Sequence, residues 1–217
     1  MTRKRIPAAE RRSLILEAAR KVFAESGYEG AKTQRIAAQA KVSEALVYRH
    51  FPSKLALYRA VLRQLVRDQD ANFQAMFLPE PSTAGLVRSI SNYIAICVRE
   101  QDSRVHEGLR MLVASLAGEG GYASLAYRRS QRKIEERLVA AIAAARAAGD
   151  IAGRPIAPKN FAMFQEHLGT MLNMVGALPN HSEIYDKGDD RLLRDAVWFC
   201  CRGIGLTDEA IRHHYDE

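Results

Sequence analysis

Apolar residues recur with helical spacing along almost the whole of this chain, and that periodicity limits the folds it can adopt. Alternation with period two is never sustained, and runs of β-branched residues are scarce. The pattern predicts helices at about 7–27, 32–39, 43–50, 53–77, 84–100, 104–117, 121–148, 158–178, 190–204 and 207–215. We therefore predict an all-α protein, with three small helices followed by a larger helical bundle.

Residues that commonly start and stop helices fall at the predicted boundaries. Pro7 is suited to begin the first helix, and Gly27 is a natural place for it to stop. Ser43 and Ser53 are suitable N-caps for the third and fourth helices. Pro52 separates these two helices, because proline cannot continue a helix.

The net charge of +7 is unevenly distributed over the 217 residues. Residues 1–66 hold 14 Lys and Arg against 5 Glu and no Asp, which gives +9, whereas the remainder holds 18 against 20, which gives −2. Such asymmetry favours a polyanion-binding module joined to a nearly neutral body. The alternative is a solvated basic surface without a partner.

Two short predicted helices joined by a three-residue turn, at about 32–51, form a helix-turn-helix pattern. In such a unit the second helix enters the major groove of DNA by its N-terminal end. One face of this helix carries Glu44, Ala45, Tyr48 and Arg49, and the opposite face carries Val42, Val47 and Phe51. A carboxylate such as Glu44 can accept from cytosine N4, and Ala45 can contact a thymine methyl. Tyr48, His50 and Lys54 can contact phosphates.

Residues 15–58, ILEAARKVFAESGYEGAKTQRIAAQAKVSEALVYRHFPSKLALY, closely resemble the DNA-binding domain of the TetR (tetracycline-repressor) family. The resemblance covers about a fifth of the chain. It rests on Ala18-Ala19 with Phe23, Gly27-Tyr28, Ile36-Ala37, Ala40, Val42-Ser43, Tyr48, His50-Phe51 and Lys54. It implies DNA contacts by Lys32, Thr33, Gln34, Glu44, Ala45, Tyr48, His50 and Lys54. Arg49, on the same face of the helix as Tyr48, is a further candidate.

Two positions depart from the family pattern. Lys41 stands where the turn usually has glycine, so we expect a left-handed backbone there at a cost of about 1 kcal/mol. Ala31 replaces the usual threonine, which weakens that N-cap and leaves Thr33 to supply a hydroxyl.

Several of the assigned contacts have a structural alternative. Tyr48 could pack between helices and His50 could be buried, while Arg35 and Arg49 could be solvated surface. The basic arm at residues 3–5 could reach the minor groove or phosphates.

We expect residues 8–68 to form the DNA-binding domain and residues 69–217 to form a ligand-sensing and dimerisation domain. Proteins with this geometry usually bind inverted half-sites as dimers. The last two long predicted helices have wide apolar faces and stripes of small residues, which a partner subunit could cover. The resemblance implies that they pair with their symmetry mates as a four-helix bundle. The expected interface residues are Phe161, Ala162, Gly169, Gly176, Leu192, Ala196, Phe199 and Gly203. The alternative is that both helices are buried within one chain.

Regulators of this kind usually sense a small molecule in the larger domain. Aromatic and sulfur-containing side chains suit an adaptable apolar cavity, although they suit an ordinary core equally. The candidates for such a pocket are Tyr93, Cys97, Met111, Phe164, His167, Met171 and Met174. We therefore expect a homodimeric regulator, a repressor that an unidentified small-molecule effector releases from a pseudo-palindromic operator in double-stranded DNA. The alternatives are a ligand-independent DNA-binding scaffold and a thiol sensor that uses Cys97, Cys200 and Cys201.

Other function classes lack their sequence signals. There is no phosphate-cradling glycine loop, metal-ligand cluster or nucleophile signature, so we expect neither an enzyme nor a resident cofactor or metal. The basic start is not followed by the apolar segment of a secretory signal, and no stretch suits a bilayer span. The odd cysteine count gives no disulfide framework. These features predict a cytoplasmic, nucleoid-associated protein with reduced thiols.

Overall fold

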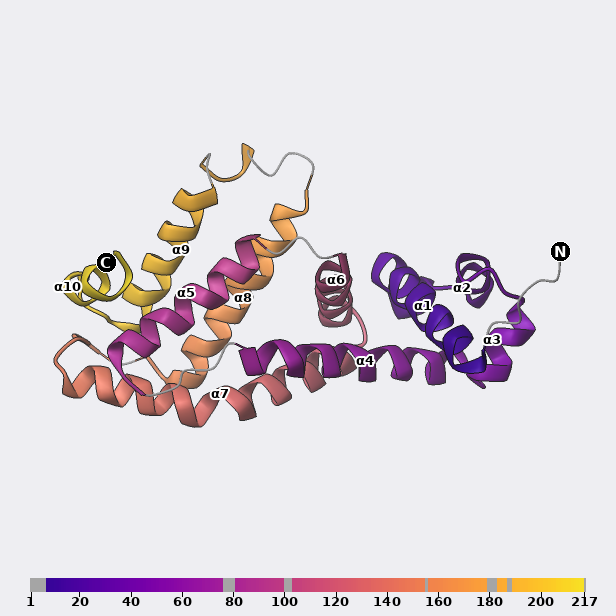
Figure 1. Ribbon diagram of the computed structural model, residues 1–217, viewed down its shortest axis with the longest axis horizontal. Helices are drawn as coiled ribbons and strands as arrows, with labels where there is room; N and C mark the ends of the chain where they lie inside the picture. Colours follow the sequence, from indigo (N-terminus) through magenta and orange to yellow (C-terminus); the bar gives the residue numbers. More distant parts are fainter. Residues whose placement is uncertain are drawn as a thin grey trace. The chain divides into compact units, whose positions relative to one another are not determined.

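The computed structural model describes residues 7–75, 81–99, 103–154, 156–178, 183–186 and 189–216 (Figure 1). Within these ranges the regular structure is helical, and the only extended pairing is an isolated bridge between Ile151 and Leu206. The helices are α1 (Ala8–Gly30), α2 (Thr33–Gln39), α3 (Glu44–His50), α4 (Lys54–Ala75), α5 (Thr83–Arg99), α6 (Ser103–Ala117), α7 (Gly121–Ala147), α8 (Pro158–Gly176), α9 (Asp189–Ile204) and α10 (Asp208–Ile211), with a π-helical turn (Arg212–Asp216) after α10. The all-α prediction is confirmed.

The local signals act as the sequence predicts. Ser43 Oγ accepts from the Leu46 backbone N–H at 3.3 Å, and Ser53 Oγ accepts from that of Ala56 at 3.0 Å. Gly27, at φ 64°, interrupts the helical geometry of α1 three residues before its assigned end. Lys41 has φ 54° and is the only non-glycine among the described residues with a positive φ, so the expected left-handed turn residue is confirmed.

The chain folds into two compact units, and each contains two segments. The first unit comprises residues 1–71 and 103–126, and the second comprises residues 72–102 and 127–217. Helix α6 therefore belongs with α1 to α4, whereas the expected domain boundary near residue 68 assigned it to the larger domain. No described helix has the length and apolar character to cross a membrane.

An ion pair and apolar packing join α6 to α1 in the first unit. Arg20, 4% exposed, donates from Nε to Glu107 Oε2 at 2.6 Å. Met111 and Leu112 are both buried on α6, and so are Val22 and Phe23 on α1. A charged pair inside an apolar contact needs both partners, because a single buried charge is costly.

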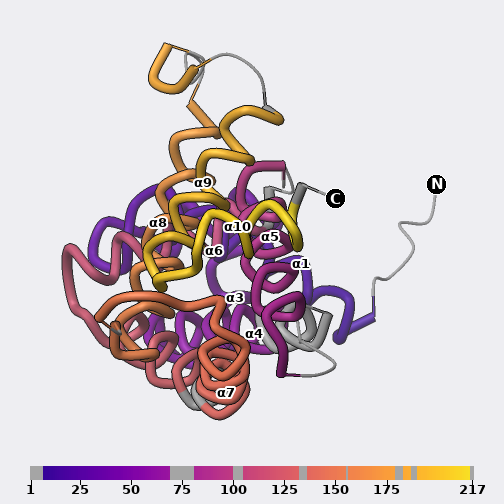
Figure 2. Tube along the Cα trace, turned by 90° about the vertical axis from the view of Figure 1, so that its left-hand side faces the viewer, coloured from indigo at the N-terminus to yellow at the C-terminus, as the bar shows by residue number. Residues whose placement is uncertain are grey.

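The core of the second unit lies where α5 packs on α8 and α9 (Figures 1 and 2). Ile90, Ile94, Phe161, Leu172 and Val197 are among its buried side chains. Figure 2 shows that α10 lies close to α9 in space as well as in sequence.

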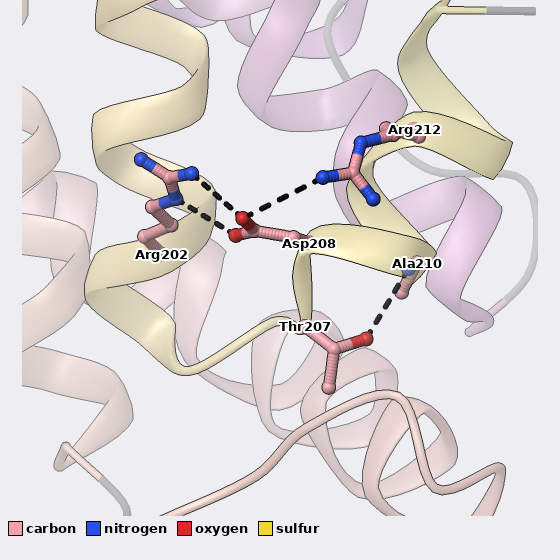
Figure 3. Close-up of polar contacts among 5 residues, drawn as sticks. All are labelled: Arg202, Thr207, Asp208, Ala210 and Arg212. Atoms are coloured by element: carbon pink, nitrogen blue, oxygen red, sulfur yellow. Dashed lines mark hydrogen bonds and ion pairs between the residues drawn. The ribbon is translucent and has the colours of Figure 1, made fainter.

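Polar contacts hold the C-terminal segment of the second unit in place (Figure 3). Thr207 Oγ1 caps α10 by accepting from the Ala210 backbone N–H at 3.2 Å. Asp208 accepts from Arg202 Nε at 2.9 Å and Nη2 at 2.8 Å, and Arg212 lies 3.8 Å from the same carboxylate. The two-point contact with Arg202 lowers the pKa of Asp208.

Candidate DNA-binding interface

Helix α3 has one buried face and one solvent-exposed face. Val47 is 1% exposed on the inner side, whereas Ala45, Tyr48 and Arg49 are exposed on the other. Glu44 is half-buried in the first turn of the helix. The exposed side chains can therefore enter the major groove of DNA while Val47 stays packed in the core.

A hydrogen bond between two hydroxyl groups joins the start of α2 to the exposed face of α3. Tyr48 Oη donates to Thr33 Oγ1 at 3.3 Å, and Thr33 is otherwise buried. Lys32 and Gln34, on either side of Thr33, are exposed. The structure thus brings the candidate residues of α2 and α3 together, and Tyr48 has a structural hydrogen bond in addition to its exposed ring.

Lys54 is held by contacts within the protein. Its ammonium donates to the Glu29 carbonyl at 3.1 Å and lies 4.8 Å from the centroid of the Tyr28 ring. His50 is half-buried at the end of α3. These contacts position the Lys54 side chain at the start of α4 and reduce its freedom to move toward a phosphate.

The structure reveals further contacts of basic residues that the sequence pattern did not predict. Arg35 donates to the Glu25 carboxylate and, at 3.0 Å, to Ser26 Oγ. The Arg12 guanidinium lies 4.8 Å from the centroid of the Phe51 ring. Nothing in local spacing signals either contact, because each joins different helices. The basic arm at residues 3–5 lies outside the described residues.

The candidate pocket residues are divided between the two units. Met111 belongs to the first unit, and the other six belong to the second. Phe164 and Met171 are 60% and 46% exposed, His167 is exposed, and Met174 is half-buried. His167 packs edge-on against Tyr127 at 5.5 Å between ring centroids. Phe164 and Met171 thus lie on the outward face of α8, and a pocket formed by these candidates stays a prediction.

Tyr93 and Cys97 meet at a polar contact between α5 and α8. Tyr93 Oη donates to Glu166 Oε2 at 3.2 Å. The side chains of Tyr93 and Cys97 occupy the space left by the missing side chain of Gly169. A Cβ on Gly169 would lie 2.6 Å from the Tyr93 ring. Burial raises the pKa of Glu166, and the hydrogen bond from Tyr93 opposes that rise.

The expected interface residues divide between the core and the surface. Phe161, Ala162 and Ala196 are buried inside the second unit, and Leu192 packs against its core. Gly169 accommodates Tyr93 and Cys97, so its small size serves packing within the chain. Phe199 is 67% exposed, and a Cβ on Gly176 or Gly203 would meet no atom within 4 Å. Phe161, Ala162 and Ala196 thus pack within a single chain, whereas Phe199, Gly176 and Gly203 lie open, and the interface itself stays a prediction.

The three thiols lie in environments that suppress reactivity. Burial raises the pKa of Cys97, Cys200 and Cys201 to about 12 in each case. A thiol with so little thiolate is a poor nucleophile. This burial argues against the thiol-sensor alternative. Among the described residues, no three His, Cys, Asp or Glu side chains cluster as metal ligands.

Residues 15–61 match the family described as bacterial regulatory proteins, tetR family. The chain is 48% identical over 62 residues to the HTH-type transcriptional activator FasR of Mycolicibacterium smegmatis, covering 29% of this chain and 28% of FasR. It is 32% identical over 111 residues to the HTH-type transcriptional regulator UidR of Escherichia coli K12, covering 50% of this chain and 51% of UidR. The alignments thus span about a quarter to a half of these relatives.

Solved structures share the fold over most of the chain. A regulatory protein of the tetR family from Rhodococcus RHA1 superimposes with a TM-score of 0.66 at 24% identity, covering 92% of this chain and 99% of that protein. AibR, solved in complex with isovaleryl coenzyme A and operator DNA, superimposes with a TM-score of 0.65 at 20% identity, covering 87% of this chain and 97% of AibR. Residues 15–61 thus match the tetR family of bacterial regulatory proteins over the helix-turn-helix DNA-binding domain, and the chain shares the helical fold of these solved structures.

Proposed function

We propose that the protein is a dimeric repressor that binds a pseudo-palindromic operator and is released by a small-molecule effector. The observation that carries the DNA-binding part is the exposed face of α3, where Ala45, Tyr48 and Arg49 face solvent while Val47 anchors the helix. A short helix anchored on one side and polar on the other suits insertion into the major groove.

The proposed contacts divide into base reading and phosphate binding. Glu44 and Ala45, in the first turn of α3, read base edges. Lys32, Thr33 and Gln34 on α2, together with Tyr48, Arg49, His50 and Lys54, contact the backbone. The Tyr48–Thr33 hydrogen bond supports this division, because it holds the first turn of α2 next to α3.

A second copy of the chain is proposed to cover the outward faces of α8 and α9. Phe164, Met171 and Leu178 are exposed at intervals of seven residues, and each is at least 46% exposed. On α9, Phe199 is also exposed and the backbone at Gly203 is open. Exposed apolar side chains in such a row favour burial against another helix pair.

Effector binding is proposed for the second unit, with Tyr93 and Cys97 beside Glu166 as its polar contacts. AibR supports ligand control of this kind, because it was solved with both isovaleryl coenzyme A and operator DNA. A ligand that binds the free and DNA-bound forms with different affinity must shift operator affinity by the same factor.

Footprinting on the DNA that flanks the protein's own gene tests the proposal. We expect a protected inverted repeat at moderate salt, with one protected half-site per subunit. Arg49→Ala should weaken binding to every site, Glu44→Ala should change the preferred sequence, and Arg146→Ala, an exposed arginine on α7, is the matched control. Absence of a protected site, or equal loss with Arg146→Ala, would contradict the proposal. A promoter fusion whose transcription rises when the protein is deleted supports repression, and a fall would instead identify an activator.

A further inference from the structure

A cavity of about 160 Å³ lies in the first unit, where the end of α1, the start of α4 and the C-terminal half of α6 meet. Gly27 ends the regular geometry of α1 at this point. The described lining comprises Phe23, Ser26, Gly27, Tyr28, Glu29, Tyr58, Met111, Ala114, Ser115, Gly118 and Glu119. The cavity has room for roughly five water-sized groups.

Three aromatic rings form one wall of this cavity. The Phe23 and Tyr58 ring centroids lie 4.9 Å apart, as do those of Tyr28 and Tyr58. Phe23 and Tyr58 are buried, whereas Tyr28 is half-buried. Aromatic faces carry negative electrostatic potential and attract cations.

The remaining polar groups give the cavity a negative charge. Glu29 and Glu119 are among the lining residues, and the described lining contains no lysine, arginine or histidine. Desolvation opposes the ionisation of Glu119, but hydrogen bonds from Ser115, from the Gly121 and Tyr122 backbone and from Tyr58 outweigh it and lower its pKa. The carboxylate is fixed in position, because it accepts from Ser115 Oγ and from the Gly121 N–H, both at 2.6 Å.

The protein already places one cation on this wall. The Lys54 ammonium lies 4.8 Å from the Tyr28 ring centroid, although Lys54 is not among the described lining residues. The Tyr28 ring therefore already takes part in one cation–π contact within the protein.

We propose that this cavity is a binding site for the head group of a small organic cation, an ammonium or quaternary ammonium group. The aromatic wall receives the alkyl groups and the charge, and Glu119 supplies the counter-charge. The Glu119 carboxylate disfavours a small anion, and a neutral apolar group would gain nothing from that charge. The site is distinct from the effector contacts proposed for the second unit, since every described lining residue belongs to the first.

Calorimetric titration of the full chain with choline tests this proposal in the absence of DNA. The control ligand is 3,3-dimethylbutan-1-ol, which has nearly the same shape and no charge. We expect saturable binding of choline with one site per chain, and at least tenfold weaker binding of the neutral alcohol. Equal affinity for the two, or no binding of choline at millimolar concentration, would overturn the proposal.

Substitutions locate the site. Glu119→Gln keeps the size and the acceptor oxygen but removes the charge, so choline affinity should fall at least fivefold. Tyr28→Phe should leave it within twofold, whereas Tyr28→Leu should lower it at least fivefold. Glu209→Gln, an exposed glutamate on α10, is the matched control, and far-UV circular dichroism checks that each variant is folded. An equal loss with Glu119→Gln and Glu209→Gln would place choline elsewhere and refute the site. Because no DNA is present, failure here leaves the proposed repressor function untouched.

Discussion

The ion pair between Arg20 and Glu107 joins two helices that are far apart in the sequence. Removing either partner should lower the free energy of unfolding, but by different amounts. The Arg20 side chain is 5% exposed and that of Glu107 is 14% exposed. A guanidinium cannot lose its proton in a protein, so Glu107→Ala leaves a buried charge. A second carboxylate, that of Asp68, lies 4.0 Å from Arg20, and the Asp68 side chain is 52% exposed. That contact can compensate only a little.

The magnitudes follow from burial and geometry. Removing one partner of a buried ion pair costs about 3–5 kcal/mol, and we expect Glu107→Ala to fall in that range. Arg20→Met should cost less, about 2–3 kcal/mol, because Glu107 is more exposed and can recruit water. The double variant Arg20→Met/Glu107→Leu removes both charges and supplies apolar volume, so its cost should be about 1–2 kcal/mol and well below the sum of the single costs.

Urea denaturation followed by far-UV circular dichroism measures these free energies of unfolding. Hydrogen exchange of α1 and α6 peptides shows which helices lose protection. Arg99→Met, which removes the exposed pair with Asp190 at 3.0 Å, is the matched control and should change stability by less than about 0.5 kcal/mol. Additive costs in the double variant, or a larger cost for Arg20→Met than for Glu107→Ala, would refute the reasoning.

Three other perturbations have defined outcomes. Lys41→Gly should raise the free energy of unfolding by about 0.5–1 kcal/mol, because glycine adopts φ 54° without the strain of a side chain. Thermal denaturation measures this gain, and an equal gain with Lys41→Ala would contradict the explanation. Burial raises the pKa of Glu166, so the folded state favours the protonated carboxyl and stability should fall as pH rises from about 4.3 through the raised pKa. Glu166→Gln should flatten this pH dependence in denaturation curves followed by Trp198 fluorescence, and an unchanged slope would argue against it. Since burial raises the pKa of Cys200 and Cys201 to about 12, both thiols should react with a disulfide reagent at pH 7.5 only after urea is added, and rapid reaction of the native protein would show that they are accessible.

Local signals in the sequence predict most of the helices. Ser43, Ser53 and Gly27 act within one helical turn of themselves, so their effects do not depend on distant parts of the chain. The same locality explains why the inner and outer faces of α3 are predictable, because Val47 and Tyr48 differ in direction as a consequence of helical geometry alone.

Positions that depend on packing between helices are less predictable. Phe161 and Phe164 lie three residues apart and both belong to a broad apolar stripe, yet one is 3% exposed and the other 60%. The neighbouring helix α5 decides this difference, and periodicity within α8 contains no information about where α5 packs. Met111 is a similar case, since its position follows from the packing of α6 on α1.

The discontinuity of the first unit has a consequence for synthesis. Residues 72–102 are translated between the two segments that make up this unit. When residue 71 leaves the ribosome, the carboxylate that pairs with the Arg20 guanidinium has not yet emerged, because Glu107 lies 87 residues after Arg20. A nascent DNA-binding unit must therefore remain incomplete through the translation of α5, with the apolar surface of α1 open to chaperones until α6 emerges.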